Sequence, residues 1–335
     1  ERTSSGQYEM HKATVEMYLC SDGKTIWNSP KYDGDKTMYD EFRNRDRRLL
    51  LQVVPPYFAV NGLNMDFTPN GTKNSTKYGA AVNVDEYADL LKQILPSNTS
   101  KRLPVFNWSG TMNWTSPNVN GPGQAPMGSR SGYFMWRHYN LWDENSNMAS
   151  TNYCDKPIFY IEEVLLNYAE AMYETNQFDQ SVANATINKL RKRVAVDDMV
   201  VSEIDENFDP KRDKTVDPVL WEIRRERMVE LMGEGFGFQD VRRWKKADWY
   251  INRDQMGVYI KKADYTNASG AIVPAWNNLN LVDRDFNAVT GEGYLKRFIN
   301  PVKEGKGWQE HYYLFPIPLN DLSLNKSLEQ NDGWK

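Results

Sequence analysis

The sequence predicts a mainly helical protein in which pairs of helices support long, aromatic-rich loops. From residue 155 onward, apolar residues recur at helical spacing, whereas residues 61–155 have little helical period and are rich in Asn, Gly, Ser and Trp. Aromatic residues make up 13% of the chain, with 11 Trp and 19 Tyr. We therefore expect residues 1–154 to form a loop-rich ligand-binding segment, and residues 155–335 to form a helical repeat scaffold with a C-terminal tail.

The first helix is predicted to follow Asp155 and Pro157, residue types that favour a helix start. Asn176 is expected to end it. Six residues then recur at steps of three and four and predict one buried face: Ile158, Ile161, Leu165, Tyr168, Ala169 and Met172.

A second helix is predicted after the cap residue Asp179, and the resulting pair of helices is similar to a tetratricopeptide repeat. A third helix should run from Asp217-Pro218 to about Met232 and end at the glycines 233, 235 and 237. A fourth should start at Gln239. Only two pairs are visible, fewer than the three or more that a stable solenoid needs.

The remaining regions have weaker patterns. Residues 1–60 mix short strand-like runs with polar turns, and residues 260–310 have a polar, aromatic and irregular composition. Near the end, a short strand-like run contains Pro316 and Pro318, and a turn-rich tail follows.

Composition excludes several classes of protein. A net charge of −4 with no basic stripe argues against nucleic-acid binding, and no run of 18 apolar residues is available to span a membrane. The two cysteines, Cys20 and Cys154, allow one disulfide or none, and the three histidines make a zinc site improbable. The first residues form no signal peptide, so we expect a processed or truncated chain.

The sequence contains no recognisable catalytic motif. It has no Gly-x-Ser-x-Gly elbow, and its many acids show no pattern that separates a catalytic pair from loop carboxylates. Asp33-Gly34-Asp35 lacks the later ligands of a calcium loop. The charged run at 224–234 is expected to form ion pairs along one helix face, worth about 0.2–0.5 kcal/mol each. We expect no enzyme activity and no cofactor.

Aromatic residues in polar loops are the best candidates for a ligand site. Sugar rings have apolar faces that stack on aromatic planes, and their hydroxyls need polar partners. The loop at 104–121 contains two Asn-Trp pairs six residues apart. The full set of candidate binding residues is Asn107, Trp108, Asn113, Trp114, Arg130, Trp27, Tyr32, Trp276 and Asn277. For each Trp, the alternative is that the ring fixes its loop to the scaffold.

Several segments together resemble the SusD/RagB family of nutrient-binding outer-membrane lipoproteins. The matching segments are MYLCSDGKTIWNSPKYDGD, NRDRRLLLQVVPP, SGYFMWRHY, IEEVLLNYAEAMYE, ERMVELMGEGFGFQDVRRW and YLFPIPLNDLSLNKSLEQNDGW. The chain departs from the family at Gly237 and Gln239, where a basic residue and an aromatic are usual. It also lacks the lipidated Cys and the further N-terminal repeats of that family. The resemblance implies a SusD-like fold whose partner helices lie in a missing N-terminal half.

The resemblance also implies a function. It predicts non-catalytic binding of an oligosaccharide at the outer face of the outer membrane, and delivery to a SusC-like TonB-dependent transporter. The membrane link would be a lipid anchor outside this chain. A RagB-like receptor for peptides, a secreted glycoside hydrolase and a protein-docking scaffold remain alternatives.

Overall fold

A computed structural model describes residues 9–53, 59–60, 113–114, 131–133, 135, 137, 157–261, 280–296 and 307–334. The chain divides into two compact units, and each is described by itself. Unit 1 contains Glu1–Glu230 and Met256–Arg297, and unit 2 contains Leu231–Gln255 and Phe298–Lys335. The division at residue 154 inferred from the sequence stays a prediction.

Unit 1 begins with three short helices, where the sequence predicted strand-like runs. They are α1 (Lys12–Val15), α2 (Met38–Phe42) and α3 (Arg47–Gln52). The side chain of Asp46 caps α3 by accepting a hydrogen bond from the backbone N–H of Arg48. Val15, Met38, Phe42, Leu49 and Leu50 are buried, whereas Leu51 is 38% exposed.

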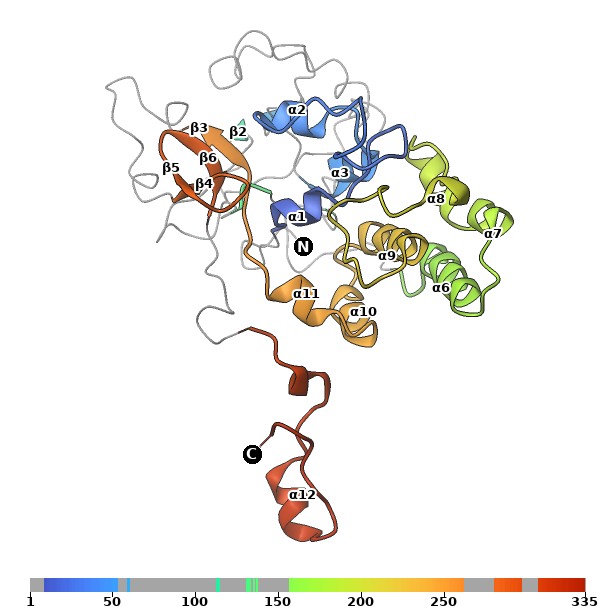
Figure 1. Ribbon diagram of the computed structural model, residues 1–335, viewed down its shortest axis with the longest axis vertical. Helices are drawn as coiled ribbons and strands as arrows, with labels where there is room; N and C mark the ends of the chain where they lie inside the picture. Colours follow the sequence, from blue (N-terminus) through green and yellow to red (C-terminus); the bar gives the residue numbers. More distant parts are fainter. Residues whose placement is uncertain are drawn as a thin grey trace. The chain divides into compact units, whose positions relative to one another are not determined.

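Four further helices of unit 1 pack together, as the predicted helix pair requires (Figure 1). Helix α6 (Ile161–Glu174) contacts α7 (Gln180–Ala185), α8 (Ile187–Arg193) and α9 (Pro218–Glu230). The prediction of a mainly helical protein is thus confirmed. A short 3-10 helix, Val201–Glu203, lies in the connection between α8 and α9.

The helix boundaries follow the predicted caps at two of three positions. Asp179 accepts a hydrogen bond from the N–H of Val182, and Asp217 accepts one from the N–H of Val219. The predicted second helix is split, because Thr186 leaves helical geometry at φ −123° and ψ −92°. The first helix begins later than predicted, after Tyr160, whose side chain makes no capping hydrogen bond.

The predicted buried face of α6 is wrong in large part. Ala169 is fully buried, but the exposed fractions of Ile158, Ile161 and Tyr168 are 84%, 65% and 49%. The buried contacts of the helix come from a neighbouring face that includes Leu166. Helical spacing identified the apolar residues of α6, but it could not tell which of two apolar faces packs within this chain.

A four-stranded antiparallel sheet completes the described part of unit 1, in a region for which the sequence predicted irregular structure. Its strands are β3 (Tyr259–Lys261), β4 (Leu281–Val282), β5 (Ala288–Val289) and β6 (Glu292–Leu295), in the order β3-β6-β4-β5. The strands are two to four residues long, too short for an alternating pattern to stand out. A separate ladder pairs β1 (Ala59–Val60) with β2 (Asn113–Trp114).

Unit 2 contains short helices and a group of aromatic rings. The predicted fourth helix is two helices, α10 (Gly237–Arg243) and α11 (Ala247–Ile251), because Lys245 adopts a left-handed φ of 55° between them. Trp308 packs edge-on against Phe238, Tyr312 and Tyr313. The tail forms a 3-10 turn (Glu310–Tyr313) and α12 (Leu319–Leu324), in place of the predicted strand-like run.

Candidate functional site

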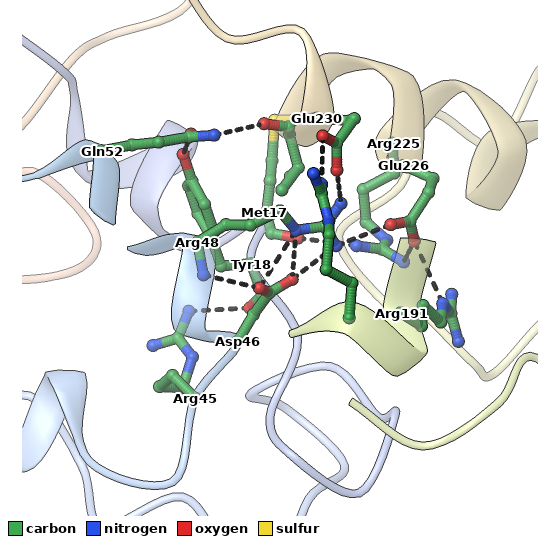
Figure 2. Close-up of polar contacts among 12 residues, drawn as sticks. Met17, Tyr18, Arg45, Asp46, Arg48, Gln52, Arg191, Arg225, Glu226 and Glu230 are labelled. Carbon is green, nitrogen blue, oxygen red and sulfur yellow. Dashed lines mark hydrogen bonds and ion pairs between the residues drawn. The ribbon is translucent and has the colours of Figure 1, made fainter. Parts of the chain in front are cut away.

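Unit 1 contains a buried network of charged side chains, which we call the Arg48 network (Figure 2). Arg48 lies between carboxylates: its Nη2 is 2.6 Å from oxygens of both Asp46 and Glu226, and its Nη1 is 2.7 Å from Glu230 Oε2. The network comprises Asp46, Arg48, Arg191, Glu222, Arg225, Glu226 and Glu230.

Glu226 is the carboxylate shared by three arginines. Its Oε2 lies 3.0 Å from Arg191 Nε and 3.6 Å from Arg225 Nη2, in addition to the contact with Arg48. Burial alone would raise the pKa of Glu226, but the three guanidinium groups outweigh it and lower that pKa to about 2. Glu226 is therefore a permanent anion within a structural cluster and is unsuited to proton transfer at neutral pH.

This arrangement corrects the expectation of ion pairs along one helix face. In α9, Arg225, Glu226 and Glu230 are buried, and the partners Arg48 and Arg191 come from α3 and α8. Two pairs within the helix remain, from Arg225 to Glu222 at 2.7 Å and to Glu226 at 3.6 Å. The charged run thus connects three helices, an outcome that spacing within one helix cannot reveal.

A second buried network, the Lys12 network, consists of Lys12, Asp35, Glu41, Tyr133 and Tyr294. Lys12 Nζ is 2.9 Å from Asp35 Oδ2 and 2.5 Å from Glu41 Oε1. The hydroxyl of Tyr133 donates to Glu41 at 2.8 Å, and that of Tyr294 donates to Asp35 at 2.7 Å. Residues from α1, α2 and β6 therefore meet at these two carboxylates, and each carboxylate has polar partners that compensate for its burial.

The two carboxylates of this network have different electrostatic environments. Burial opposes the ionisation of Asp35, but Lys12 and then Arg284 outweigh it, and the pKa of Asp35 falls to about 2. For the fully buried Glu41, burial dominates over the Lys12 attraction, so its pKa is raised. Each acid is nevertheless hydrogen-bonded to a lysine and to a tyrosine hydroxyl. We therefore assign both carboxylates a structural role.

A calcium site at Asp33-Gly34-Asp35 receives no support from the geometry. Asp35 is directed to Lys12 and Arg284, whereas Asp33 lies 3.7 Å from Arg43 Nη1 and accepts a hydrogen bond from Asn44. Across the described part of the chain, no group of three or more His, Cys, Asp or Glu side chains is placed to hold a metal ion.

Two of the sequence-predicted binding residues, Trp27 and Tyr32, have described side chains. Both lie in the turn-rich segment that precedes α2. Trp27 is partly buried, and its ring centroid is 5.0 Å from Arg284 Cζ and 5.3 Å from Lys211 Nζ. Tyr32 lies 5.4 Å from Arg45 Cζ, and its hydroxyl is buried. Burial, followed by the nearby Glu41 carboxylate, raises the pKa of Tyr32.

The basic residues around Trp27 could not have been found from sequence spacing. Lys211 precedes α9, and Arg284 follows β4, more than 180 and 250 positions from Trp27 as the residue numbers show. Arg284 also contacts Glu16 at 2.9 Å and Asp35, so it links the Trp27 ring to the Lys12 network. The segment 25–28 is held in place by hydrogen bonds from Thr25 and Asn28 to the carbonyl of Phe208.

The other candidate binding residues are placed only in part. Asn113 and Trp114 form β2 and pair with β1, so the backbone of the second Asn-Trp pair is positioned. Outside the described residues lie Asn107, Trp108, Arg130, Trp276 and Asn277. Cys20 is a buried free thiol, and Cys154 is also outside the described residues. Among the helices that the structure describes, none combines the length and apolar character needed to cross a membrane.

Comparison with solved structures identifies similar folds. The chain aligns with the structure of BT4246 at 16% identity and a TM-score of 0.57, over 99% of this chain and 47% of that one. A SusD-like carbohydrate binding protein from Bacteroides fragilis NCTC 9343 is 21% identical, with a TM-score of 0.46, over 95% of this chain and 48% of that one. The chain thus spans about half the length of these proteins. No curated protein matches it significantly.

A family model gives the broadest result. The model described as the SusD family matches residues 1–334, which is nearly the whole sequence. The resemblance inferred from the sequence segments is therefore confirmed, and the helix-rich architecture of unit 1 agrees with it. The chain belongs to the SusD family and has a mainly helical, SusD-like fold.

Proposed function

We propose that the protein binds a glycan without catalysing a reaction on it and delivers it to a SusC-type TonB-dependent transporter. The proposal rests on membership of the SusD family across residues 1–334. In this function the protein acts at the outer face of the outer membrane, with a lipid anchor outside these 335 residues. No cofactor takes part.

The proposed glycan surface is built from the aromatic loops. Trp108 and Trp114 provide planes for the apolar faces of sugar rings, and the preceding Asn107 and Asn113 provide hydrogen bonds for hydroxyls. The pairing of β2 with β1 supports this choice, because it holds the backbone of Asn113 and Trp114 in an extended ladder. Secondary contacts come from Arg130, Trp276, Asn277, Trp27 and Tyr32.

Within this set, Trp27 and Tyr32 differ in what they offer a ligand. The partly exposed ring of Trp27 has two basic side chains over it, so it offers an aromatic ring next to hydrogen-bond donors. The hydroxyl of Tyr32 is buried, so a direct hydrogen bond to a sugar would require that turn to move. Trp27 is therefore the stronger of the two.

Several buried acids in unit 1 favour binding over hydrolysis. Glycoside hydrolases need one carboxylic acid and one carboxylate facing each other across a sugar cleft. Asp35, Glu41 and Glu226 are instead buried in ion pairs with lysine or arginine, which leaves them no access to a bound sugar.

The proposal is tested by thermal shift against a panel of oligosaccharides, repeated with Trp108→Ala and Trp114→Ala. A ligand at about 100 times its Kd stabilises the folded state by about 2.7 kcal/mol, which is enough to detect. We expect a shift with one glycan class that is lost in either variant. Phe159→Ala serves as the control, because Phe159 is an exposed aromatic outside the candidate loops.

The other outcomes distinguish the alternatives. Shifts with peptides and with no glycan would assign a peptide cargo. Release of reducing sugar that disappears on replacing one acid would assign a hydrolase. Equal shifts in wild type and in both Trp variants would remove Trp108 and Trp114 from the site.

A further inference from the structure

Basic and aromatic side chains of unit 1 follow one another in a continuous series of contacts, which we call the Trp27 row. Arg284 Cζ lies 5.0 Å from the centroid of the Trp27 ring, and Lys211 Nζ lies 5.3 Å from it. Arg284 Cζ is also 5.1 Å from the centroid of Tyr294, which packs edge-on against Tyr259 at 5.2 Å. The complete row is Lys36, Tyr259, Tyr294, Arg284, Trp27 and Lys211.

The two ends of the row are exposed lysines that make no ion pair with any described residue. Lys36 Nζ lies 4.0 Å from the centroid of the Tyr259 ring, and Lys211 is exposed next to Trp27. Both lysines therefore keep a positive charge that the described part of the chain does not neutralise. Tyr259 and Tyr294 are buried, so the lysines and the partly exposed Trp27 are groups of the row that a ligand can reach.

Arg284 has a different part in the row, because its charge is already compensated. It donates hydrogen bonds to Glu16 at 2.9 Å and to Asp35, and these contacts fix the guanidinium against the Trp27 ring. The backbone next to the ring is fixed as well, since Asn28 Nδ2 donates to the carbonyl oxygen of Asn207 at 2.7 Å. A ring that is already held in place loses little conformational freedom when a ligand stacks on it.

We propose that the Trp27 row binds a sugar unit that carries an anionic group, either a carboxylate or a sulfate ester. This inference rests on the proposed function and names the class of glycan as acidic. The apolar face of the sugar ring stacks on Trp27. The flexible stem of Lys211 lets its ammonium turn from the Trp27 ring to the anionic group, to which it donates a charge-assisted hydrogen bond. Lys36 offers a second cation to a neighbouring acidic unit of the same glycan.

The test measures by calorimetry the binding of two pairs of oligosaccharides that differ only in charge. One pair is tri-galacturonic acid and its methyl ester, and the other is a κ-carrageenan tetrasaccharide and its desulfated form, so the pairs distinguish carboxylate from sulfate. In at least one pair we expect wild type to bind the acidic member about two- to fivefold more tightly at low salt, as is typical of one exposed ion pair.

Variants locate the preference within the row. Lys211→Gln should remove the preference and leave the affinity for the neutral member unchanged. Trp27→Ala should weaken the binding of both members, because the stacking plane is lost. Lys214→Gln is the matched control: it removes the same charge from an exposed lysine three positions away, whose Nζ donates to the Glu206 carbonyl at 3.2 Å. This control should keep the preference.

Other results would overturn the inference and separate its failure from that of the proposed function. Equal affinity within both pairs, or binding of neutral oligosaccharides alone, would remove the acidic ligand and leave glycan binding in place. A preference that survives Lys211→Gln or an affinity that survives Trp27→Ala would move the site away from the row. A preference lost equally in Lys214→Gln would reduce it to a general charge effect. Binding of no glycan, acidic or neutral, would remove the proposed function itself.

Discussion

Replacing Glu226 with Gln is the sharpest test of the buried Arg48 network. The substitution keeps the shape of the side chain but removes the charge that Arg48, Arg191 and Arg225 share. Removing one partner of a buried ion pair costs about 3–5 kcal/mol, because the remaining charges stay buried and undercompensated. The network predicts a loss of this size for Glu226→Gln.

The lowered pKa of Glu226 gives a second, independent value for the free energy that its charge contributes to folding. It falls from the ordinary 4.5 to about 2, and each unit of pKa corresponds to about 1.4 kcal/mol. The ionised form of Glu226 therefore stabilises the folded state by about 3 kcal/mol. Solvent screening does not reduce this value, because the side chain is fully buried. Since the folded pKa lies below the unfolded one, this contribution is present above pH 4.5 and disappears as the pH falls to about 2.

The assay is denaturant unfolding of wild type and Glu226→Gln at several pH values. We expect a difference in unfolding free energy of about 3 kcal/mol at pH 7, which shrinks progressively below pH 4.5. Glu203→Gln, at an exposed position, is the control and should change stability by less than about 0.5 kcal/mol. A difference below about 1 kcal/mol at pH 7, or one that does not change with pH, would refute the reasoning.

Three further substitutions test other parts of unit 1, and a fourth, in unit 2, is a control for the third. Asp35→Asn should lower the thermal midpoint above pH 3.8 and lose its effect as the pH falls to about 2, because Lys12 and Arg284 favour the ionised form; melting curves at pH 7 and pH 2.5 test this. Asp179→Ala should cost about 1 kcal/mol in urea unfolding, because it removes the cap of α7; an unchanged midpoint would contradict the cap. Gly257→Ala should lower the unfolding midpoint, because the added Cβ would lie 2.3 Å from the Ser131 carbonyl oxygen. Gly237→Ala, which has open space around the added Cβ, should leave stability within about 1 kcal/mol of wild type.

The helices of unit 1 were predictable because their signals are local. Asp179 and Asp217 stand immediately before their helices, and their side-chain caps need only neighbouring residues. The same locality explains the error at Thr186, where a single backbone distortion divides a helix without a glycine or proline. The four-stranded sheet was missed because its strands are too short for periodicity to be distinctive.

The candidate site was less predictable because its contacts are not local. The sequence singled out Trp27 as an aromatic residue in a polar turn, but nothing in its neighbourhood indicates Arg284 or Lys211. Likewise, the Glu-rich and Arg-rich run of α9 has good partners within its own helix, and only the tertiary fold directs Glu226 to Arg48 and Arg191. Sequence identifies such residues by type and leaves their partners open.

The connection between Arg48 and Glu230 has a consequence for synthesis on the ribosome. These two residues are 182 positions apart, so the guanidinium of Arg48 emerges long before its carboxylate partner exists. At about 5–20 residues per second, the interval is roughly 10–35 s. Throughout that time Arg48 has no carboxylate partner from α9, and its neighbour Asp46 is the network carboxylate already present. Helix α3 therefore completes its ion pairs only after α9 has been synthesised.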